Sequence, residues 1–365
     1  MPAATTSPPP RIFGGDPSSR PRFPDGGNHP MITPAGTLDA LPQSDLTPCI
    51  GREFPTLSVR TLLAAPEAQI RDLALTISQR GVVFLRGENE NENGREKSTP
   101  EDMKQLMLRI TRAAGCPESS GLHVHPLTEE GSELGDQVSV ISSAKQKKGG
   151  GLTHQLSDVS RYASAGWHSD ITFEKVPSDY AMLKIHTLPP TGGDTLWASS
   201  YEIYDRLSPP MRAFLSTLTA THDATFFHDE ARRLGNPLRL DPRGSPLNQG
   251  PDLVAVHPLV RTNPVTGWRG VYVNRGFTKR INGVTRDESD ALLAYLFGLV
   301  VQNHDAQVRF RWQKGDVAIW DNRSTMHCAT YDYAEDRAGD RVCSLGEAPY
   351  LDLDSVGRKE ALGLE

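Results

Sequence analysis

Short apolar stretches with a two-residue repeat, concentrated in the second half of the chain, most constrain the fold. Val308, Phe310 and Trp312 alternate with polar residues, which predicts a strand with one buried face. The same repeat predicts a strand at 181–185, and two more strands are predicted at 317–320 and 341–345. Strands and helices do not alternate regularly, and no glycine fingerprint follows a strand, which argues against a Rossmann-type parallel sheet. The pattern favours two packed β-sheets that form a barrel.

The first half of the chain adds helices to this framework. The apolar run at 82–85 predicts a buried strand, and apolar residues recur at helical spacing over 101–113. Two further helices are predicted to begin after Ser208, which two prolines follow, and after Thr285, which opens a capping box. We therefore expect a mainly β fold with flanking helices (α+β).

The N-terminal segment differs from the rest of the chain in its proline content. Residues 1–50 contain 11 of the 28 prolines and no periodic apolar pattern, so we expect a flexible leader or a strap on the surface. Residues 51–365 are expected to form one domain. Two polar or glycine-rich stretches, at 87–98 and 143–157, would interrupt this domain as loop insertions.

Charge and composition exclude several classes of protein. The 365 residues carry a formal net charge of −6, which does not favour nucleic acid or an anionic membrane as a partner. No stretch reaches 18 consecutive apolar residues, so no transmembrane helix is expected. The four cysteines are far apart, which is typical of a reducing, cytoplasmic location. Arg11 and Arg20, with only one acidic residue between them, leave a mitochondrial transit peptide open as the minor alternative.

His168 and Asp170 form the most informative pair of candidate ligands. Residues two apart on an extended chain point to the same side, so this pair would present an imidazole and a carboxylate together. With a third ligand they would form a facial triad that leaves three positions of an octahedral metal open. This donor set suits Fe(II) better than structural zinc. Taken alone, a His-x-Asp sequence is also typical of a surface turn.

The candidate third ligand is His327, which follows the strand that ends at Trp320. Arg337 and Arg341 come ten and fourteen residues after it. Because a guanidinium group matches a carboxylate in a bidentate manner, an arginine near such a metal would hold a dicarboxylate co-substrate. The alternatives are a core histidine bonded to the backbone and arginines in ion pairs at a strand end. Neither alternative explains why the three features occur together.

Five sequence blocks, in this order, carry a resemblance to a known family. They are LHVHP (122–126), WHSDITF (167–173), TGGDTLW (191–197), VNRGFT (273–278) and IWDNR (319–323). The chain resembles the taurine dioxygenase family of Fe(II)- and 2-oxoglutarate-dependent oxygenases, especially its fungal sulfonate dioxygenase branch. The resemblance implies a double-stranded β-helix, or jelly roll, which agrees with the strand-rich second half.

The resemblance also implies roles for individual residues. Thr195 would hydrogen-bond a carboxylate of 2-oxoglutarate, and Arg337 would bind its distal carboxylate. The loop after the third ligand is one residue shorter than in the taurine enzyme, so Arg337 and Arg341 are exchangeable in this role. The implied iron ligands are His168, Asp170 and His327, and the implied substrate contacts are His125, Arg341 and the backbone of Ile171. The implied cofactors are Fe(II), 2-oxoglutarate as a co-substrate, and O2.

These observations lead to one expected function and two alternatives. The expected enzyme hydroxylates a C–H bond of a small anionic molecule, most directly an organosulfonate. It would release sulfite and an aldehyde, with succinate and CO2 as co-products. The first alternative is hydroxylation or desaturation of a carboxylate-bearing molecule in biosynthesis, and the second is an inactive barrel that acts as a binding module. Many members of this family form dimers or tetramers, so a homo-oligomer is left open.

Overall fold

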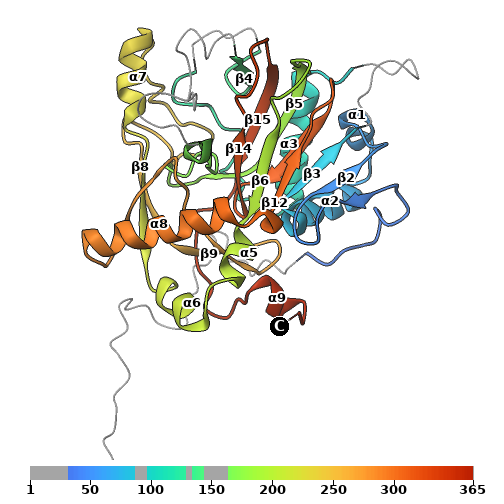
Figure 1. Ribbon diagram of the computed structural model, residues 1–365. Helices are drawn as coiled ribbons and strands as arrows, with labels where there is room; N and C mark the ends of the chain where they lie inside the picture. The colour runs from blue at the N-terminus through green and yellow to red at the C-terminus, as the bar shows by residue number, and fades with distance from the viewer. Residues whose placement is uncertain (1–31, 87–96, 129–133, 144–162, 365) are drawn as a thin grey trace, which may run out of the picture.

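The computed structural model describes residues 32–86, 97–128, 134–143 and 163–364, and its largest sheet runs through the middle of the molecule (Figure 1). The strands of this sheet are β1 (Ser44–Asp45), β2 (Arg52–Phe54), β3 (Val82–Leu85), β4 (Ser139–Ser142), β5 (Ser178–Thr187), β13 (Val317–Asp321) and β15 (Ala338–Leu345). Their order across the sheet is β1-β2-β3-β13-β5-β15-β4. Every pair is antiparallel except β2 with β3, and antiparallel pairing is typical of a jelly roll.

Three smaller sheets complete the β-structure of the described residues. The second layer of the barrel consists of β6 (Thr195–Ser199), β12 (Gln307–Phe310) and β14 (Thr325–Ala329), in the order β12-β6-β14. A separate sheet with the order β11-β7-β8 contains β7 (Thr219–Asp223), β8 (Val254–Pro258) and β11 (Thr278–Asn282). A two-stranded sheet pairs β9 (Val260–Thr262) with β10 (Arg269–Val271).

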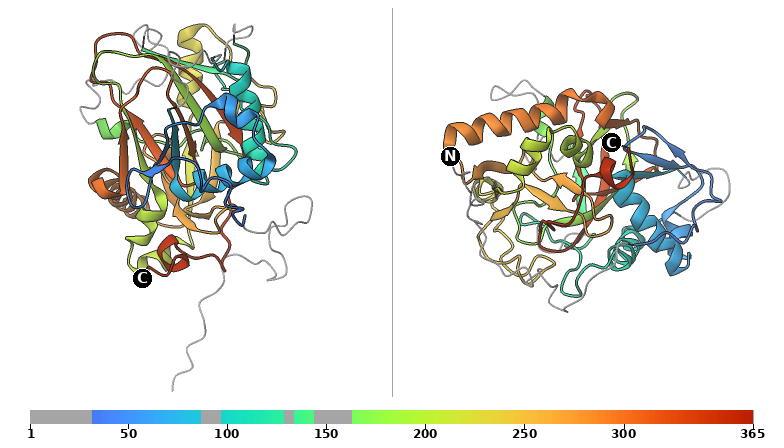
Figure 2. Two further views of the ribbon diagram at one scale, coloured as in Figure 1. Left: turned by 90° about the vertical axis from the view of Figure 1, so that its right-hand side faces the viewer. Right: turned by 90° about the horizontal axis from the view of Figure 1, so that it is seen from below.

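Helices cover the two outer sides of the barrel, as the opposed positions of α8 and α2 in Figure 2 show. The helices of the described segments are α1 (Val59–Leu63), α2 (Glu67–Arg80), α3 (Pro100–Ala113), α5 (Ser200–Asp205), α6 (Pro209–Leu215), α7 (Phe226–Leu234), α8 (Arg286–Gln302) and α9 (Arg358–Ala361), with short 3₁₀ turns at Ala163–Gly166 and His304–Ala306. The predicted capping box at the start of α8 is present, because Thr285 and Glu288 exchange hydrogen bonds.

Two hydrophobic clusters fill the two faces of the large sheet. Val83 and Leu85 of β3 point to the cluster under α1, α2 and α3. Val82 and Phe84 point to the cluster inside the barrel, where Phe84 stacks on Phe310 of β12 with 3.9 Å between the ring centroids. The sheet is therefore buried on both sides. This explains why β3 is a continuous apolar run rather than an alternating one.

The mainly β expectation with flanking helices is confirmed, and the strands predicted at 181–185 and 341–345 lie within β5 and β15. Sequence reasoning did not identify α2 or the sheet β11-β7-β8. The signal for α2 was present, since Ile70, Leu73, Ala74 and Ile77 follow helical spacing and are all buried.

The proline-rich segment is described only from residue 32. Residues 32–50 run along the surface of the body, where the carboxylate of Asp72 accepts hydrogen bonds from the backbone of Ala35 and from both the backbone and the hydroxyl of Thr37. Leu38 is buried in the cluster beneath the first helices. Most of the two expected insertions, 87–96 and 144–157, lies outside the described residues, and the division at residue 50 stays a prediction.

Among the described residues, no helix is both long and apolar enough to cross a membrane. All four cysteines lie in the described part of the chain and are free thiols, three of them buried.

Two buried histidines make the stability of the fold sensitive to pH. The Nε2–H group of His257 donates to the backbone carbonyls of Thr172 and Glu174, at 2.9 and 3.0 Å. Burial, together with Arg261, lowers the pKa of His257 to about 4, and burial holds the pKa of His222 well below its ordinary value. The unfolded rings titrate near pH 6.5, so the unfolded state binds more protons than the folded state below that pH.

We therefore predict that the free energy of unfolding falls as the pH is lowered from 6.5 towards 4. Each ring contributes up to about 1.4 kcal/mol per pH unit. Urea denaturation at several pH values measures this slope. In His257→Gln, whose amide does not titrate, the free energy of unfolding should depend less steeply on pH, by the amount that corresponds to about one proton. An unchanged slope would contradict the prediction.

Candidate metal centre

The three predicted metal ligands lie together in the structure. His168 Nε2 is 3.6 Å from one carboxylate oxygen of Asp170, and His327 Nε2 is 3.9 Å from the other. One ligand atom from each residue lies within 4.8 Å of the others, which is the spacing needed to share one ion. The His-x-Asp sequence is therefore not an isolated surface turn.

Backbone pairing brings the two histidines together. His168 forms an isolated antiparallel bridge to His327 of β14, with N–H···O distances of 3.0 and 2.7 Å. Residues directly opposite each other in an antiparallel pair project to the same face, and the two imidazole centroids are 4.2 Å apart. His168 thus extends the edge of the small sheet β12-β6-β14.

Asp170 is held by a side chain that sequence reasoning did not identify. Its backbone N–H donates to Oδ1 of Asn322, at 3.1 Å, and the indole N–H of Trp320 donates to the same oxygen. Asn322 lies in the turn between β13 and β14 and is almost fully buried. The signal was its place in the block at 319–323, directly after the end of β13.

The residue after Asp170 adopts an unusual backbone conformation. Ile171 has a φ of 65°, and it is the one non-glycine residue of the described chain with a positive φ. A β-branched residue in this region costs on the order of 1–3 kcal/mol. The backbone turns at Ile171 and leads away from the three ligands directly after Asp170. The carboxylate of Asp170 therefore stays beside the histidines.

The orientation of the His168 ring and the charge of Asp170 fit a divalent metal. His168 Nδ1 lies 2.8 Å from the carbonyl of Gly166, which can only accept, so the lone pair is on Nε2 and faces the other ligands. Burial raises the pKa of Asp170, but the guanidinium of Arg341 and the two imidazoles outweigh it and hold the pKa well below its ordinary value. Oδ2 of Asp170 is buried and accepts no hydrogen bond from the described residues. Two imidazoles and one ionised carboxylate form the donor set of a non-haem Fe(II) centre with open positions.

Arg337 and Thr195 form a second polar group that could bind an anion. Arg337 is buried, and it forms no ion pair with a described acidic side chain; it donates to the carbonyl of Gly193 (2.8 Å) and to Thr195 Oγ1 (3.3 Å). The indole N–H of Trp312 also donates to Thr195 Oγ1, at 3.0 Å. Both lone pairs of the hydroxyl are therefore occupied, which leaves its proton for an external acceptor. Sequence reasoning missed the role of Trp312.

Arg341 has a partner inside the site. Its guanidinium donates to Asp170 Oδ1 at 2.7 Å, whereas no carboxylate of the described residues forms an ion pair with Arg337. A buried cation without a counter-ion is costly, so Arg337 is the arginine that gains more from a carboxylate ligand. The contacts favour Arg337, rather than Arg341, for the distal carboxylate of a dicarboxylate co-substrate.

His125 is a neutral hydrogen-bond donor near Arg341. The backbone N–H of Leu127 donates to Nδ1 of His125 (3.1 Å), so the proton of the neutral ring is on Nε2. Burial and the guanidinium of Arg341 lower the pKa of His125 to about 3. The ring therefore stays neutral at physiological pH and can donate to an anion without carrying a charge.

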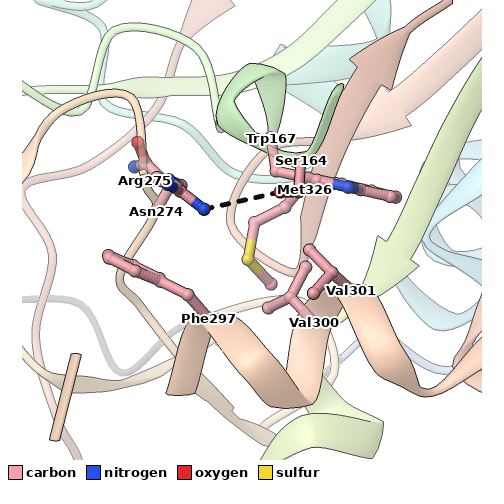
Figure 3. Close-up of a pocket in the computed structure, with 8 residues that line it drawn as sticks. All are labelled: Ser164, Trp167, Asn274, Arg275, Phe297, Val300, Val301 and Met326. Atoms are coloured by element: carbon pink, nitrogen blue, oxygen red, sulfur yellow. Dashed lines mark hydrogen bonds between the residues drawn. The ribbon is translucent and has the colours of Figure 1, made fainter. Parts of the chain in front are cut away.

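A small cavity lies behind this centre, beneath α8 (Figure 3). Trp167 and Met326, the sequence neighbours of two ligands, line it together with Phe297. Its free volume of about 10 Å³ is close to that of one water molecule. The cavity therefore has no room for an organic substrate.

We predict that Asp170→Asn lowers the affinity for a divalent metal by at least about 100-fold, or about 2.7 kcal/mol, because the amide cannot supply the negative charge. Anaerobic titration with Co(II), followed by its visible absorption, measures the affinity. Asp354→Asn, at an exposed position, is the matched control and should bind Co(II) as the unaltered protein does. Equal affinity in the two variants would contradict the assignment.

Comparisons with known proteins agree with this geometry. The family model "Taurine catabolism dioxygenase TauD, TfdA family" matches residues 42–343. The chain is 42% identical to the alpha-ketoglutarate-dependent dioxygenase btcD of Neocamarosporium betae, over 90% of this chain and 98% of that protein. It is 31% identical to the alpha-ketoglutarate-dependent sulfonate dioxygenase of Saccharomyces cerevisiae, over 90% of this chain and 72% of that protein.

A solved structure is also similar. The crystal structure of a taurine dioxygenase from Burkholderia xenovorans superposes with a TM-score of 0.62 and 28% identity, and covers 85% of this chain and 91% of that one. The jelly-roll expectation and the resemblance to this family are thus confirmed. The chain belongs to the TauD/TfdA family of alpha-ketoglutarate-dependent dioxygenases, enzymes that use Fe(II), 2-oxoglutarate and O2.

Proposed function

We propose that this dioxygenase hydroxylates a C–H bond of a small anionic molecule, most directly an organosulfonate. The observation that carries the proposal is the position of Arg341, which reaches the metal-binding carboxylate of Asp170 at 2.7 Å and so brings a cation to the reacting centre. Relatives named sulfonate dioxygenase and sulfate ester dioxygenase support an anionic substrate.

In this proposal His168, Asp170 and His327 hold Fe(II), which supplies oxygen activation when it is bound. The guanidinium of Arg337 binds the distal carboxylate of 2-oxoglutarate, and the hydroxyl of Thr195 donates its proton to the same group. Trp312 keeps the Thr195 hydroxyl oriented by donating to its oxygen at 3.0 Å. These contacts orient the co-substrate without a proton transfer from the protein.

The substrate contacts are Arg341, the Nε2–H group of His125 and the backbone of Ile171. Arg341 supplies charge, and His125 supplies a neutral donor. A sulfonate or carboxylate has enough oxygens to accept from both. The left-handed conformation of Ile171 turns its peptide groups out of the regular strand, at the edge of the metal site.

The products follow from the position that is hydroxylated. When the carbon that carries the sulfonate is hydroxylated, the C–S bond breaks, sulfur leaves with the electron pair as sulfite, and the hydroxyl loses its proton to give an aldehyde. Decarboxylation of 2-oxoglutarate to succinate and CO2 supplies the two electrons that complete the reduction of O2. The overall reaction is therefore balanced without a further reductant.

A carboxylate substrate in biosynthesis is the second candidate, with hydroxylation or desaturation as the outcome. A guanidinium fork binds a carboxylate as well as it binds a sulfonate. Relatives that are 39–42% identical are named only as dioxygenases, whereas the relative from Saccharomyces cerevisiae that is named for sulfonates is 31% identical.

We also propose a cytoplasmic location, because four free cysteines fit a reducing compartment. Cell fractionation tests it, and recovery of the enzyme in mitochondria would overturn it.

Thr195→Val is predicted to raise the dissociation constant for 2-oxoglutarate about 10–100-fold, because one hydrogen bond to a charged group is lost. The visible band of the anaerobic Fe(II)–2-oxoglutarate complex reports the constant. Thr195→Ser keeps the hydroxyl and should bind within a few-fold of the unaltered enzyme. If valine and serine behaved alike, the hydroxyl would have no such role.

The substrate class is tested with matched alkyl sulfonates and carboxylates, while succinate and sulfite are measured together. We predict equimolar succinate and sulfite with a sulfonate. His125→Phe should lower kcat/KM about 10–100-fold and leave 2-oxoglutarate binding unchanged, while His125→Gln, which keeps a donor, should retain more activity. Turnover of carboxylates alone, without sulfite, would favour the second candidate.

A further inference from the structure

We propose that the loop at 273–278, here called the clamp loop, positions the metal-binding turn at 168–172 and thereby sets the affinity of the site for its metal. The loop connects β10 to β11 and contains none of the proposed metal ligands or substrate contacts. The proposal rests on the metal site and not on the identity of the substrate.

Asn274 of the clamp loop is hydrogen-bonded to Thr172 of the metal-binding turn. Its side-chain Nδ2 donates to Thr172 Oγ1 at 3.0 Å, and its Oδ1 accepts from the backbone N–H of Phe277 at 2.9 Å. The backbone N–H of Asn274 donates to Thr278 Oγ1, also at 2.9 Å. One buried side chain therefore ties the conformation of the loop to a residue two positions after the ligand Asp170.

Gly276 of the same loop packs on the other ligand of the His-x-Asp pair. A Cβ atom at this position would lie 3.1 Å from Cβ of His168, closer than ordinary van der Waals contact. The ring of Phe277 packs edge-on against His168, with 6.3 Å between centroids, and contacts Phe173 at 5.0 Å. The loop thus contacts the chain on both sides of Asp170.

Histidines from β7 and β8 hold Thr172 as well. His222 Nδ1 is 3.0 Å from Thr172 Oγ1, and His257 donates to the Thr172 carbonyl at 2.9 Å. Thr172 is fully buried, so these protein groups are its hydrogen-bond partners in place of water. The sheet β11-β7-β8 and the clamp loop together fix this one residue.

The turn needs these hydrogen bonds because the backbone of Ile171 is strained. Its positive φ costs on the order of 1–3 kcal/mol, and it persists only where the surroundings determine it. Asn322 fixes the backbone before Ile171, and Thr172 fixes the backbone after it. If the second anchor were released, Ile171 could relax and the Asp170 carboxylate would turn away from the histidines.

The test compares Thr172→Val with Thr172→Ser in the full chain, with Co(II) alone as the probe. Valine keeps the shape but removes the hydroxyl, whereas serine keeps the hydroxyl. We expect valine to weaken Co(II) binding about 10–100-fold, and serine to bind within about threefold of the unaltered protein. The melting temperature of the metal-free protein is measured in parallel, because a residue with only a structural role would lower it without changing the affinity of the folded protein.

Gly276→Ala provides an independent test if the threonine variants do not fold. It should also weaken Co(II) binding, whereas Gly298→Ala in α8, where an added Cβ meets its nearest atom at 3.5 Å, should not. The proposal is overturned if Thr172→Val and Gly276→Ala bind Co(II) as tightly as the unaltered protein, or if serine is as impaired as valine. Since no substrate is used, these outcomes are independent of which anion the enzyme oxidises.

Discussion

The two backbone hydrogen bonds between His168 and His327 are the constraint on which the rest of the active site depends. They join segments that lie far apart in the sequence, and they do so at the edge of β14, where the ladder with β6 already fixes the direction of the chain. Because paired residues share a face, the two imidazoles meet without further adjustment. Asp170 follows His168 by two residues, and its carboxylate lies beside both imidazoles.

The distribution of buried charge distinguishes the two arginines of the site. Arg341 and Asp170 form a close pair, so the carboxylate stays ionised despite its burial. Arg337 donates side-chain hydrogen bonds only to neutral groups of the described residues, and burial lowers its pKa. A carboxylate ligand would relieve this cost, which gives binding energy to the co-substrate at a place set by the fold rather than by the metal.

Several elements could be predicted because their signals are local. Three helices were identified in this way: α6 by the prolines that begin it, α8 by its capping box, and α3 by its apolar repeat. Helix α2 had the same kind of signal and was overlooked. The sheet β11-β7-β8 carries a weaker one, because β8 exposes Val254 and Val256 on its outer side and does not show the usual alternation of apolar and polar residues. Long-range pairing, which decides such strands, is not visible in a local pattern.

The sequence by itself indicated which groups are the candidates for holding the metal. The types and spacing of His168, Asp170 and His327 indicate a ferrous site, since two imidazoles and one carboxylate are the donor set of a non-haem Fe(II) centre with open positions. The tertiary structure decided how these groups are held. Contacts between distant segments fix the left-handed conformation of Ile171 and the hydrogen bonds of Thr172. They also give the two arginines different partners. Such contacts form only when the sheets of the barrel pack together, because each one joins residues that are far apart in the sequence.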